Sequence, residues 1–399
     1  MTKRIFSILL ISSFVSLNLG AQSFVDAVKD AFRPLISNNS DSASEDDDKE
    51  KEEEVHKLKD GVVYIGEMKG RKPHGKGKAI YPTGHTYEGE FVDGLRHGKG
   101  VYRFSEDEWY EGEFVEDCQE GKGTYYYPDG KVYKGDWARD YQHGNGRMDY
   151  PNGDYYEGYW IEDQRSGKGL YYFNKSTASY YGEWKDDMYD GQGTYTWPDG
   201  SKYKGMWKKG RRNGVGTYTS ADSLVCVGEW VDNCLEGKVE CSYPNGEKYA
   251  GFFKNGAREG LGKYTFADGS YYHGEFRNNM RDGKGRMAFA NGAVYDGEWK
   301  EDMKHGVGKY EWVNGDVYEG EWKNDKMHGH GVLLMADGRK YSGGFVNGKE
   351  HGAGVAVDKD RTRYEGTFVE GQRHGKFIVK DSFNRFVREC VYHYGKIKK

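Results

Sequence analysis

Residues 318–331 read Tyr-Glu-Gly-Glu-Trp-Lys-Asn-Asp-Lys-Met-His-Gly-His-Gly, and residues 295–308 read Tyr-Asp-Gly-Glu-Trp-Lys-Glu-Asp-Met-Lys-His-Gly-Val-Gly. Both stretches place glycine two, eleven and thirteen residues after the tyrosine, and tryptophan four residues after it. The two tyrosines lie 23 residues apart, and this spacing continues in both directions along the chain. A fixed period of this length predicts that the chain folds as a stack of structural repeats.

Fourteen such units extend from about residue 61 to residue 382. Counting the tyrosine as position 0, glycine occupies positions 2 and 11 in every unit and position 13 in twelve, with Val239 and Phe377 as the exceptions. These positions hold most of the 59 glycines, which make up about 15% of the chain against an ordinary usage of about 7%. Position 0 is held by Tyr64, Tyr87, Tyr110, Tyr133, Tyr156, Tyr180, Tyr203, Cys226, Tyr249, Tyr272, Tyr295, Tyr318, Tyr341 and Tyr364.

Each unit is predicted to form a β-hairpin. Positions 0, 2 and 4 alternate along a first strand, and positions 11, 13, 15 and 17 alternate along a second, so that one face carries glycines and aromatic rings. Asp-Gly and Asn-Gly pairs between the units favour tight turns. We expect rings to lie over glycines of the neighbouring strand, which explains the glycines at positions 2, 11 and 13. Tyr295, Trp299, Tyr318 and Trp322 are predicted to belong to this repeat core.

The sequence therefore predicts an all-β fold: an elongated, single-layer, twisted antiparallel sheet of tandem 23-residue hairpins. A single unit buries too few apolar side chains to offset the entropy of ordering its backbone. Neighbouring units must share their aromatic face, as in other repeat proteins.

The quoted runs resemble the MORN (membrane occupation and recognition nexus) repeat, and the resemblance covers residues 61–383. It implies a groove-like sheet with aromatic residues on its concave side, and together with the N-terminal pattern described below it identifies the chain as a bacterial-type exported member of this family. It also implies scaffolding, self-association or membrane association. Enzymes of the family carry a separate catalytic domain, which we do not expect in this chain. Choline-binding repeats also form aromatic hairpins, but they lack glycines at positions 11 and 13.

The segments outside the repeats have their own patterns. Lys3 and Arg4 precede an apolar run and the small residue Ala21, which predicts a signal peptide over residues 1–21 and export to the periplasm or medium; a retained membrane anchor is the alternative. A short amphipathic helix is predicted over residues 22–37. Residues 38–60 are predicted to be an acidic disordered linker, and residues 384–399 a closing strand with a basic tail.

No catalytic, metal or cofactor site is predicted. The acids at position 3 recur in most units and are expected to pair with lysines at position 12 on the neighbouring strand. Histidines recur at position 10, but strand spacing would hold them about 9–10 Å apart, too far to ligate one metal ion. The net charge of −5 argues against nucleic acid as a partner.

Three kinds of ligand remain open. A protein segment or a second copy could dock in the groove or on an end strand, and a glycan could stack on exposed rings. Lipid headgroups could contact the basic residues Lys208, Lys209, Arg211 and Arg212, although charges of both signs alternate along the repeats. Cys226 and Cys241 are predicted to share the aromatic face, either as a disulfide or as two core thiols.

Overall fold

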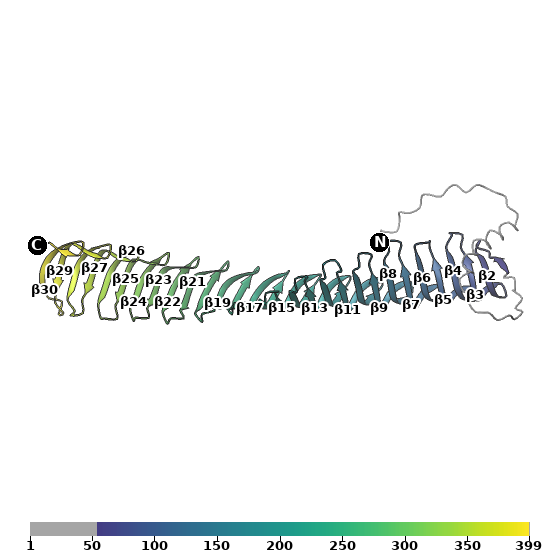
Figure 1. The fold of residues 1–399 in the computed structure, drawn as a ribbon, viewed down its shortest axis with the longest axis horizontal. Helices are drawn as coiled ribbons and strands as arrows, with labels where there is room; N and C mark the ends of the chain where they lie inside the picture. Colours follow the sequence, from purple (N-terminus) through teal and green to yellow (C-terminus); the bar gives the residue numbers. More distant parts are fainter. Residues whose placement is uncertain (1–53, 399) are drawn as a thin grey trace, which may run out of the picture. The chain divides into compact units, whose positions relative to one another are not determined.

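The computed structural model describes residues 54–398, and every regular element in this range is a β-strand. The all-β fold of tandem antiparallel hairpins is confirmed. The chain divides into two compact units: the first holds the residues up to Pro128 with Trp137–Asp140, and the second holds Asp129–Asp136 with Tyr141 onwards. Figure 1 shows the strands of each unit following one another in the order of the sequence.

The first unit contains β1 (Val55–Lys57), β2 (Val63–Lys69), β3 (Lys72–Ile80), β4 (Thr86–Val92), β5 (Leu95–Arg103), β6 (Trp109–Val115) and β7 (Cys118–Tyr126). The boundary between the units falls within β8 (Val132–Ala138). The second unit continues with β9 (Tyr141–Asp149), β10 (Tyr155–Ile161), β11 (Gln164–Tyr172), β12 (Ser179–Lys185), β13 (Met188–Thr196), β14 (Lys202–Lys208), β15 (Arg211–Thr219), β16 (Val225–Val231), β17 (Cys234–Ser242), β18 (Lys248–Lys254), β19 (Ala257–Thr265), β20 (Tyr271–Arg277), β21 (Met280–Ala288), β22 (Val294–Lys300), β23 (Met303–Glu311), β24 (Val317–Lys323), β25 (Lys326–Leu334), β26 (Lys340–Val346), β27 (Lys349–Val357), β28 (Arg363–Val369), β29 (Gln372–Lys380), β30 (Phe386–His393) and β31 (Lys396–Ile397).

The register of the strands aligns glycine with glycine. Within the hairpin β22–β23, Gly297 pairs with Gly308. Between hairpins, Gly308 of β23 pairs with Gly320 of β24. The glycines at positions 2 and 13 thus form a row across the strands, and the aromatic residues lie on the same face on either side of that row.

The turn inside each hairpin is a two-residue turn with positive φ at both central residues in many units. Asp186 and Asp187 have φ of 49° and 65°, and Asn278 and Asn279 have φ of 48° and 71°. This is the geometry of a type I′ turn, whose twist matches that of the flanking strands. Asn and Asp tolerate it better than other residues that carry a Cβ atom.

The glycine at position 11 has a different cause from the one predicted. Gly306 has a φ of 56° and lies beside a β-bulge, where the register shifts between Gly297 and Glu298. A Cβ atom at Gly306 would overlap the side chain of Glu298 rather than a ring. The positive φ beside the bulge and the Glu298 side chain on the outer face of the sheet, not ring packing, therefore explain why this residue is glycine.

Two boundaries can be compared with the prediction. Val55–Lys57 pair with Val63–Ile65 of β2, so these three residues are a strand rather than part of the linker predicted over residues 38–60. The closing strand expected after residue 384 is β30, which pairs with β29 and is followed by the short β31. The predicted signal peptide and amphipathic helix lie outside the described residues. Within residues 54–398 the structure contains no helix that could cross a membrane.

Candidate binding surface

One face of the sheet carries the glycine row and the aromatic rings, and this is the inner face. The tyrosines of position 0 form its deepest layer. Tyr318 has no exposed surface, and its hydroxyl donates a hydrogen bond to the carbonyl oxygen of Glu321 at 2.9 Å. A Cβ atom at Gly331 would overlap this hydroxyl. Burial raises the pKa of the equivalent Tyr203 and Tyr249 hydroxyls to about 12. These hydroxyls are therefore neutral structural groups rather than acids or bases available for chemistry.

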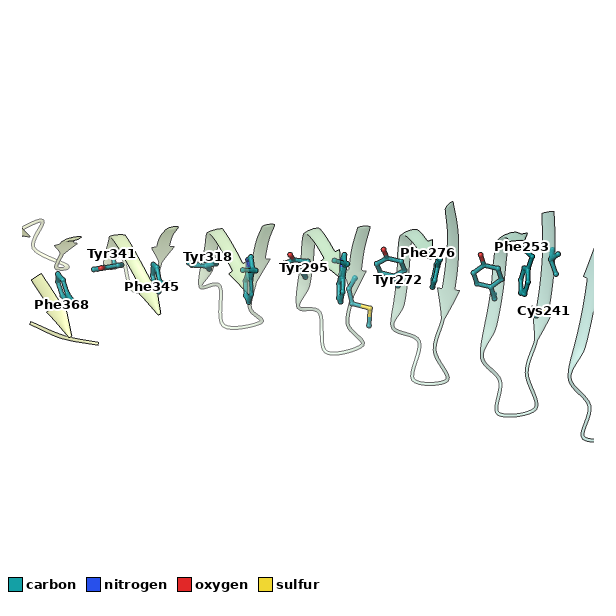
Figure 2. Close-up of a cluster of buried hydrophobic side chains, with 14 of the residues drawn as sticks. Cys241, Phe253, Tyr272, Phe276, Tyr295, Tyr318, Tyr341, Phe345 and Phe368 are labelled. Carbon is teal, nitrogen blue, oxygen red and sulfur yellow. The ribbon is translucent and has the colours of Figure 1, made fainter. Parts of the chain in front are cut away.

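The aromatic residues of position 4 complete this buried layer. Trp322 packs edge-on against Tyr318 of its own unit and against Tyr295 of the preceding unit, with ring centroids 5.2 and 5.4 Å apart. Its indole N–H donates to the carbonyl oxygen of Gly308 at 3.0 Å. Trp299 is 5% exposed in the same arrangement. Figure 2 shows tyrosine and phenylalanine rings of this layer alternating along successive hairpins.

A second row of rings, at positions 15 and 17, is only half-buried. Tyr171 and Phe173 lie with centroids 4.5 Å apart, Phe173 lies 6.3 Å from Tyr195, Tyr195 lies 4.8 Å from Trp197, and Trp197 lies 5.9 Å from Tyr218. Three hairpins thus contribute to one continuous apolar stripe. Because these rings keep part of their surface exposed, this ring stripe is the candidate binding surface of the inner face.

Basic side chains at position 9, which were not among the predicted site residues except for Arg212, border the ring stripe. The Arg281 guanidinium carbon lies 4.3 Å from the centroid of Trp299, and its Nε lies 2.9 Å from Asp302 of the next hairpin. Burial lowers the pKa of the Lys304 ammonium, which lies 4.8 Å from the Trp322 centroid. A signal was present, because basic residues recur at position 9 in Arg96, Arg165, Arg212, Arg258, Arg281, Lys304 and Arg373.

The predicted lipid contacts separate into two groups. Lys208, Lys209 and Arg211 are exposed at the turn between β14 and β15, and Arg211 lies 3.4 Å from Asp232. Arg212 points to the inner face, where its guanidinium carbon lies 4.4 Å from the centroid of Trp230. Arg212 therefore belongs with the basic row of position 9, and the other three remain together on an exposed turn.

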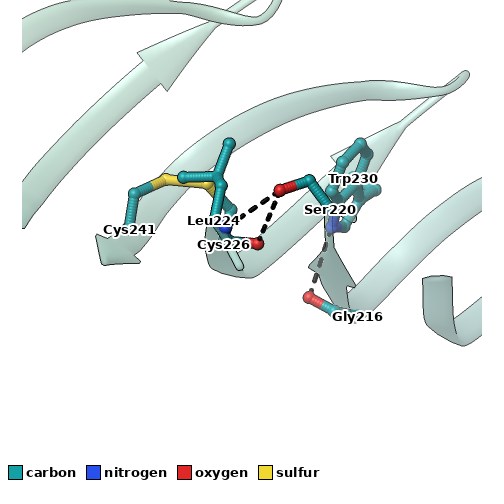
Figure 3. The surroundings of a disulfide bond; sticks show 6 residues. All are labelled: Gly216, Ser220, Leu224, Cys226, Trp230 and Cys241. Atoms are coloured by element: carbon teal, nitrogen blue, oxygen red, sulfur yellow. Dashed lines mark hydrogen bonds between the residues drawn. A yellow bond between two sulfur atoms is a disulfide. The ribbon is translucent and has the colours of Figure 1, made fainter. Parts of the chain in front are cut away.

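Cys226 and Cys241 are joined by a disulfide between β16 and β17 (Figure 3). They face each other directly in the strand register, and both are buried. Val239 replaces the usual glycine of position 13, and a Cβ atom at Gly228 would lie 2.8 Å from its Cγ2. The disulfide and the valine thus stand where other units hold a tyrosine over a glycine.

The acids of position 3 accept hydrogen bonds from backbone N–H groups. The N–H of Lys284 donates to Glu275 at 3.1 Å, and the N–H of His330 donates to Glu321 at 2.8 Å. These carboxylates bind the backbone N–H of position 12, next to the bulge, whereas the sequence predicts an ion pair with the lysine side chain of that position. Among residues 54–398 no group of three or more His, Cys, Asp or Glu residues could hold a metal ion.

These features define a tandem β-hairpin repeat protein whose inner face is built from aromatic residues. The profile of the MORN repeat matches thirteen segments between residues 64 and 376: 64–86, 87–106, 110–132, 133–155, 156–177, 180–202, 203–225, 249–271, 272–294, 295–317, 318–338, 341–363 and 364–376. The chain belongs to the MORN repeat family. The hairpin β16–β17 lies in the gap between two matches, and it is the hairpin with Cys226 and Val239 at the framework positions.

Solved structures resemble the chain only weakly. The TCP domain of Drosophila melanogaster SAS-4, solved with a proline-rich motif of Ana2, is 20% identical, covers 45% of this chain and 85% of its own, and gives a TM-score of 0.22. The TCP10 domain of Danio rerio CPAP, solved with a STIL peptide, is 12% identical, covers 68% and 96%, and gives 0.23. Virginiamycin B lyase of Staphylococcus aureus is 10% identical, covers 79% and 94%, and gives 0.12. Likeness at this level carries no inference about binding or activity. No curated protein matches the chain.

Proposed function

We propose that this protein is an exported, non-enzymatic MORN-repeat scaffold that holds a segment of a partner protein along its ring stripe. The observation that carries the proposal is the half-exposed row formed by Tyr171, Phe173, Tyr195, Trp197 and Tyr218. A continuous row of partly exposed aromatic rings keeps apolar surface in contact with water and is typical of peptide-binding grooves.

Two further features support a scaffold without catalysis. The tyrosine hydroxyls of the core are occupied by backbone carbonyl groups, as for Tyr295 and Glu298 at 2.8 Å. Carboxylates at position 3 are occupied by backbone amides, as for Asp136 and Asn145 at 2.9 Å. The polar groups that recur most often therefore maintain the fold. Export rests on the pattern of residues 1–21, and N-terminal sequencing of the mature protein would test it.

The binding role can be tested by photo-crosslinking in intact cells, followed by mass spectrometry of the captured proteins. Phe173→Ala with Trp197→Ala removes exposed ring surface from the inner face, and we expect it to abolish capture of the main partner. Tyr181→Ala removes a side chain that is 61% exposed on the opposite face, and capture should be unchanged. Equal capture by both variants and by the wild type would refute the proposal.

Membrane association is the second candidate function, because Lys208, Lys209 and Arg211 lie together on an exposed turn. Clustered basic residues contribute about 1 kcal/mol each near an anionic membrane surface. Sedimentation with phosphatidylserine vesicles should retain the protein at low salt and release it at high salt. Replacing the three residues by glutamine should abolish retention, and binding that ignores both salt and these substitutions would exclude this surface.

A further inference from the structure

The basic row at position 9 is not uniform in charge. Arg96 and Arg165 pair with Asp117 and Asp187 at 3.0 and 2.8 Å, as Arg281 does with Asp302. In each pair the aspartate is at position 7 of the following hairpin, in the I′ turn, and it accepts bonds from both the guanidinium and the backbone of the arginine. These cations are neutralised within the fold.

Arg212 and Arg258 have asparagine in place of that aspartate. The Arg212 Nη2 donates to the carbonyl oxygen of Asn233 at 2.8 Å, and Arg258 does the same with Asn279. Asparagine reproduces the backbone bond, from Arg212 N–H to Asn233 Oδ1 at 2.9 Å, but contributes no negative charge. Within residues 54–398, neither guanidinium lies within ion-pair distance of a carboxylate.

Both guanidiniums stay on the aromatic face despite this missing charge. Arg212 lies over Trp230, with Trp197 and Tyr203 nearby at 5.9 and 5.7 Å. Arg258 lies 5.0 Å from the centroid of Tyr264, a half-buried ring at position 15. Burial lowers the pKa of the Arg212 guanidinium, because desolvation disfavours its charged form.

The surface between the two arginines is largely apolar, and Glu247 is a carboxylate at its Arg258 end. Glu247 accepts a hydrogen bond from the Tyr264 hydroxyl at 2.6 Å, and both this bond and the charge of Arg258 help to lower its pKa. Arg212 lies on β15 and Arg258 on β19, so four strand steps of about 4.8 Å separate them by about 19 Å. The intervening hairpin has Leu235 at position 9, and its Tyr243 lies 5.9 Å from Tyr264. Both cysteines of the disulfide in this hairpin are buried.

We propose that Arg212 and Arg258 recognise an extended acidic peptide segment whose two carboxylates lie six residues apart and are separated by apolar residues. Six residues of a polyproline-type chain span about 19 Å, which matches the separation of the arginines. The apolar residues between them would cover Leu235 and Tyr243. This inference rests on the proposed scaffold function and specifies the chemistry of the partner.

The spacing favours a polymer over a lipid headgroup. A single headgroup is too small to contact both cations, whereas an extended chain contacts both and covers the rings between them. The charge complementarity is also local, because the neighbouring Arg281 already has its own aspartate. We therefore expect one preferred register of the peptide over β15–β19.

The test uses two synthetic peptides with blocked termini: acetyl-Glu-Pro-Pro-Leu-Pro-Pro-Glu-amide and the same peptide with both glutamates replaced by glutamine. Binding to the full chain is measured by tryptophan fluorescence and calorimetry. We expect the glutamate peptide to bind about tenfold more tightly at low salt, and the difference to shrink as salt rises. Equal binding of the two peptides, or no binding of either, would overturn the inference.

Matched variants locate the site. Asn233→Asp with Asn279→Asp gives Arg212 and Arg258 the counter-ions that Arg281 has, and aspartate is already present in such turns, as at Asp302 with a φ of 67°. This variant should fold normally and bind the glutamate peptide about tenfold more weakly. Arg281→Gln removes a neutralised arginine and should leave binding unchanged. The opposite pattern would contradict the inference.

A vesicle experiment separates the two sources of negative charge. Two results together would assign this surface to lipid and overturn the peptide proposal. Phosphatidylserine vesicles would displace the glutamate peptide from the wild type, and they would fail to bind the Asn233→Asp, Asn279→Asp variant. The peptide proposal can fail while the scaffold function stands. The scaffold function is tested by the loss of crosslinked partner in the Phe173→Ala, Trp197→Ala variant, and that experiment does not change Asn233 or Asn279.

Discussion

At the scale of single residues, the tyrosine of position 0 and the glycine of position 13 behave as one packing unit. Tyr295 is fully buried, and a Cβ atom at Gly308 would overlap its hydroxyl. Where the tyrosine is absent, at Cys226, the glycine is replaced by Val239, which is 2% exposed. Volume lost on one strand is thus regained on its neighbour, as close packing requires.

This coupling predicts a non-additive double-mutant cycle. Gly308→Val alone should destabilise the hairpin by about 1–3 kcal/mol through overpacking, and Tyr295→Cys alone by about 3–5 kcal/mol through a cavity. The double variant should recover about 1–3 kcal/mol of their sum. Hydrogen exchange of the β22–β23 amides measures the local free energy of opening. Simple additivity would show that valine and tyrosine do not compete for one space.

The buried hydroxyls also predict alkaline sensitivity. The pKa of Tyr203 and of Tyr249 is raised to about 12 in the fold, above the value of about 10 in an unfolded chain. The unfolded state therefore loses its protons first, so the stabilisation is complete below pH ~10 and is lost as the pH rises towards ~12. Tyrosinate absorbance should rise together with loss of circular dichroism. Core tyrosines that ionise near pH 10 in an intact sheet would contradict this.

The roles of residues that recur at a fixed spacing in nearly every unit could be predicted from the sequence. The roles of residues that depend on local backbone conformation, or that occur in only some units, could not. The alternation of Tyr318, Gly320 and Trp322 indicates one face of a strand from the sequence alone. Gly306 was misassigned because a positive φ and a ring contact both select glycine, and the spacing does not distinguish them. The cations of position 9 other than Arg212 were missed because only half of the units carry them. Their partners, such as Asp302 for Arg281, lie 21 residues away across a turn.

At the scale of the element, the hairpin β16–β17 departs most from the family pattern. Cys226 and Cys241 replace two rings, and the disulfide connects strands that are already paired. Because Cys226 stands at position 0, Trp230 packs against Tyr203 of the preceding unit but has no tyrosine of its own unit to contact, as Trp322 has in Tyr318. We infer that the covalent bond compensates for lost ring packing at this point.

Reduction should therefore loosen this hairpin selectively. The bond closes a loop of 15 residues, for which chain entropy gives about 3 kcal/mol. Hydrogen exchange of β16 and β17 should accelerate in dithiothreitol, while that of β24 and β25 should change little. Cys226→Ser with Cys241→Ser is the control, and reductant should have no further effect on it. Uniform acceleration across all hairpins would mean that the bond acts on the whole unit instead.

At the scale of the whole chain, each hairpin contacts its sequence neighbours, and no strand pairing within the second unit links distant repeats. Gly285 pairs with Gly297 across one hairpin boundary, just as Gly308 pairs with Gly320 across the next. Stability in such a fold is approximately a sum over repeats and their shared faces. Whole repeats should therefore be interchangeable in number, whereas fractions of a repeat should not.

Excision of residues 272–294 tests this. It removes β20 except Tyr271, all of β21 and the first residue of β22, so Tyr271 precedes Tyr295, which then stands where Tyr272 had been. The strand directions and the row of paired glycines are thereby preserved. The shortened protein should keep the circular dichroism of the wild type, with unfolding midpoints changed only slightly. Excision of residues 267–277 removes β20 alone. To keep their directions, β19 and β21 would then have to pair in parallel, and the connection left between them is too short for a parallel crossover. Loss of structure should then extend through the adjacent hairpins. If both excisions are tolerated equally, or both unfold the chain, the repeat is not the unit of stability.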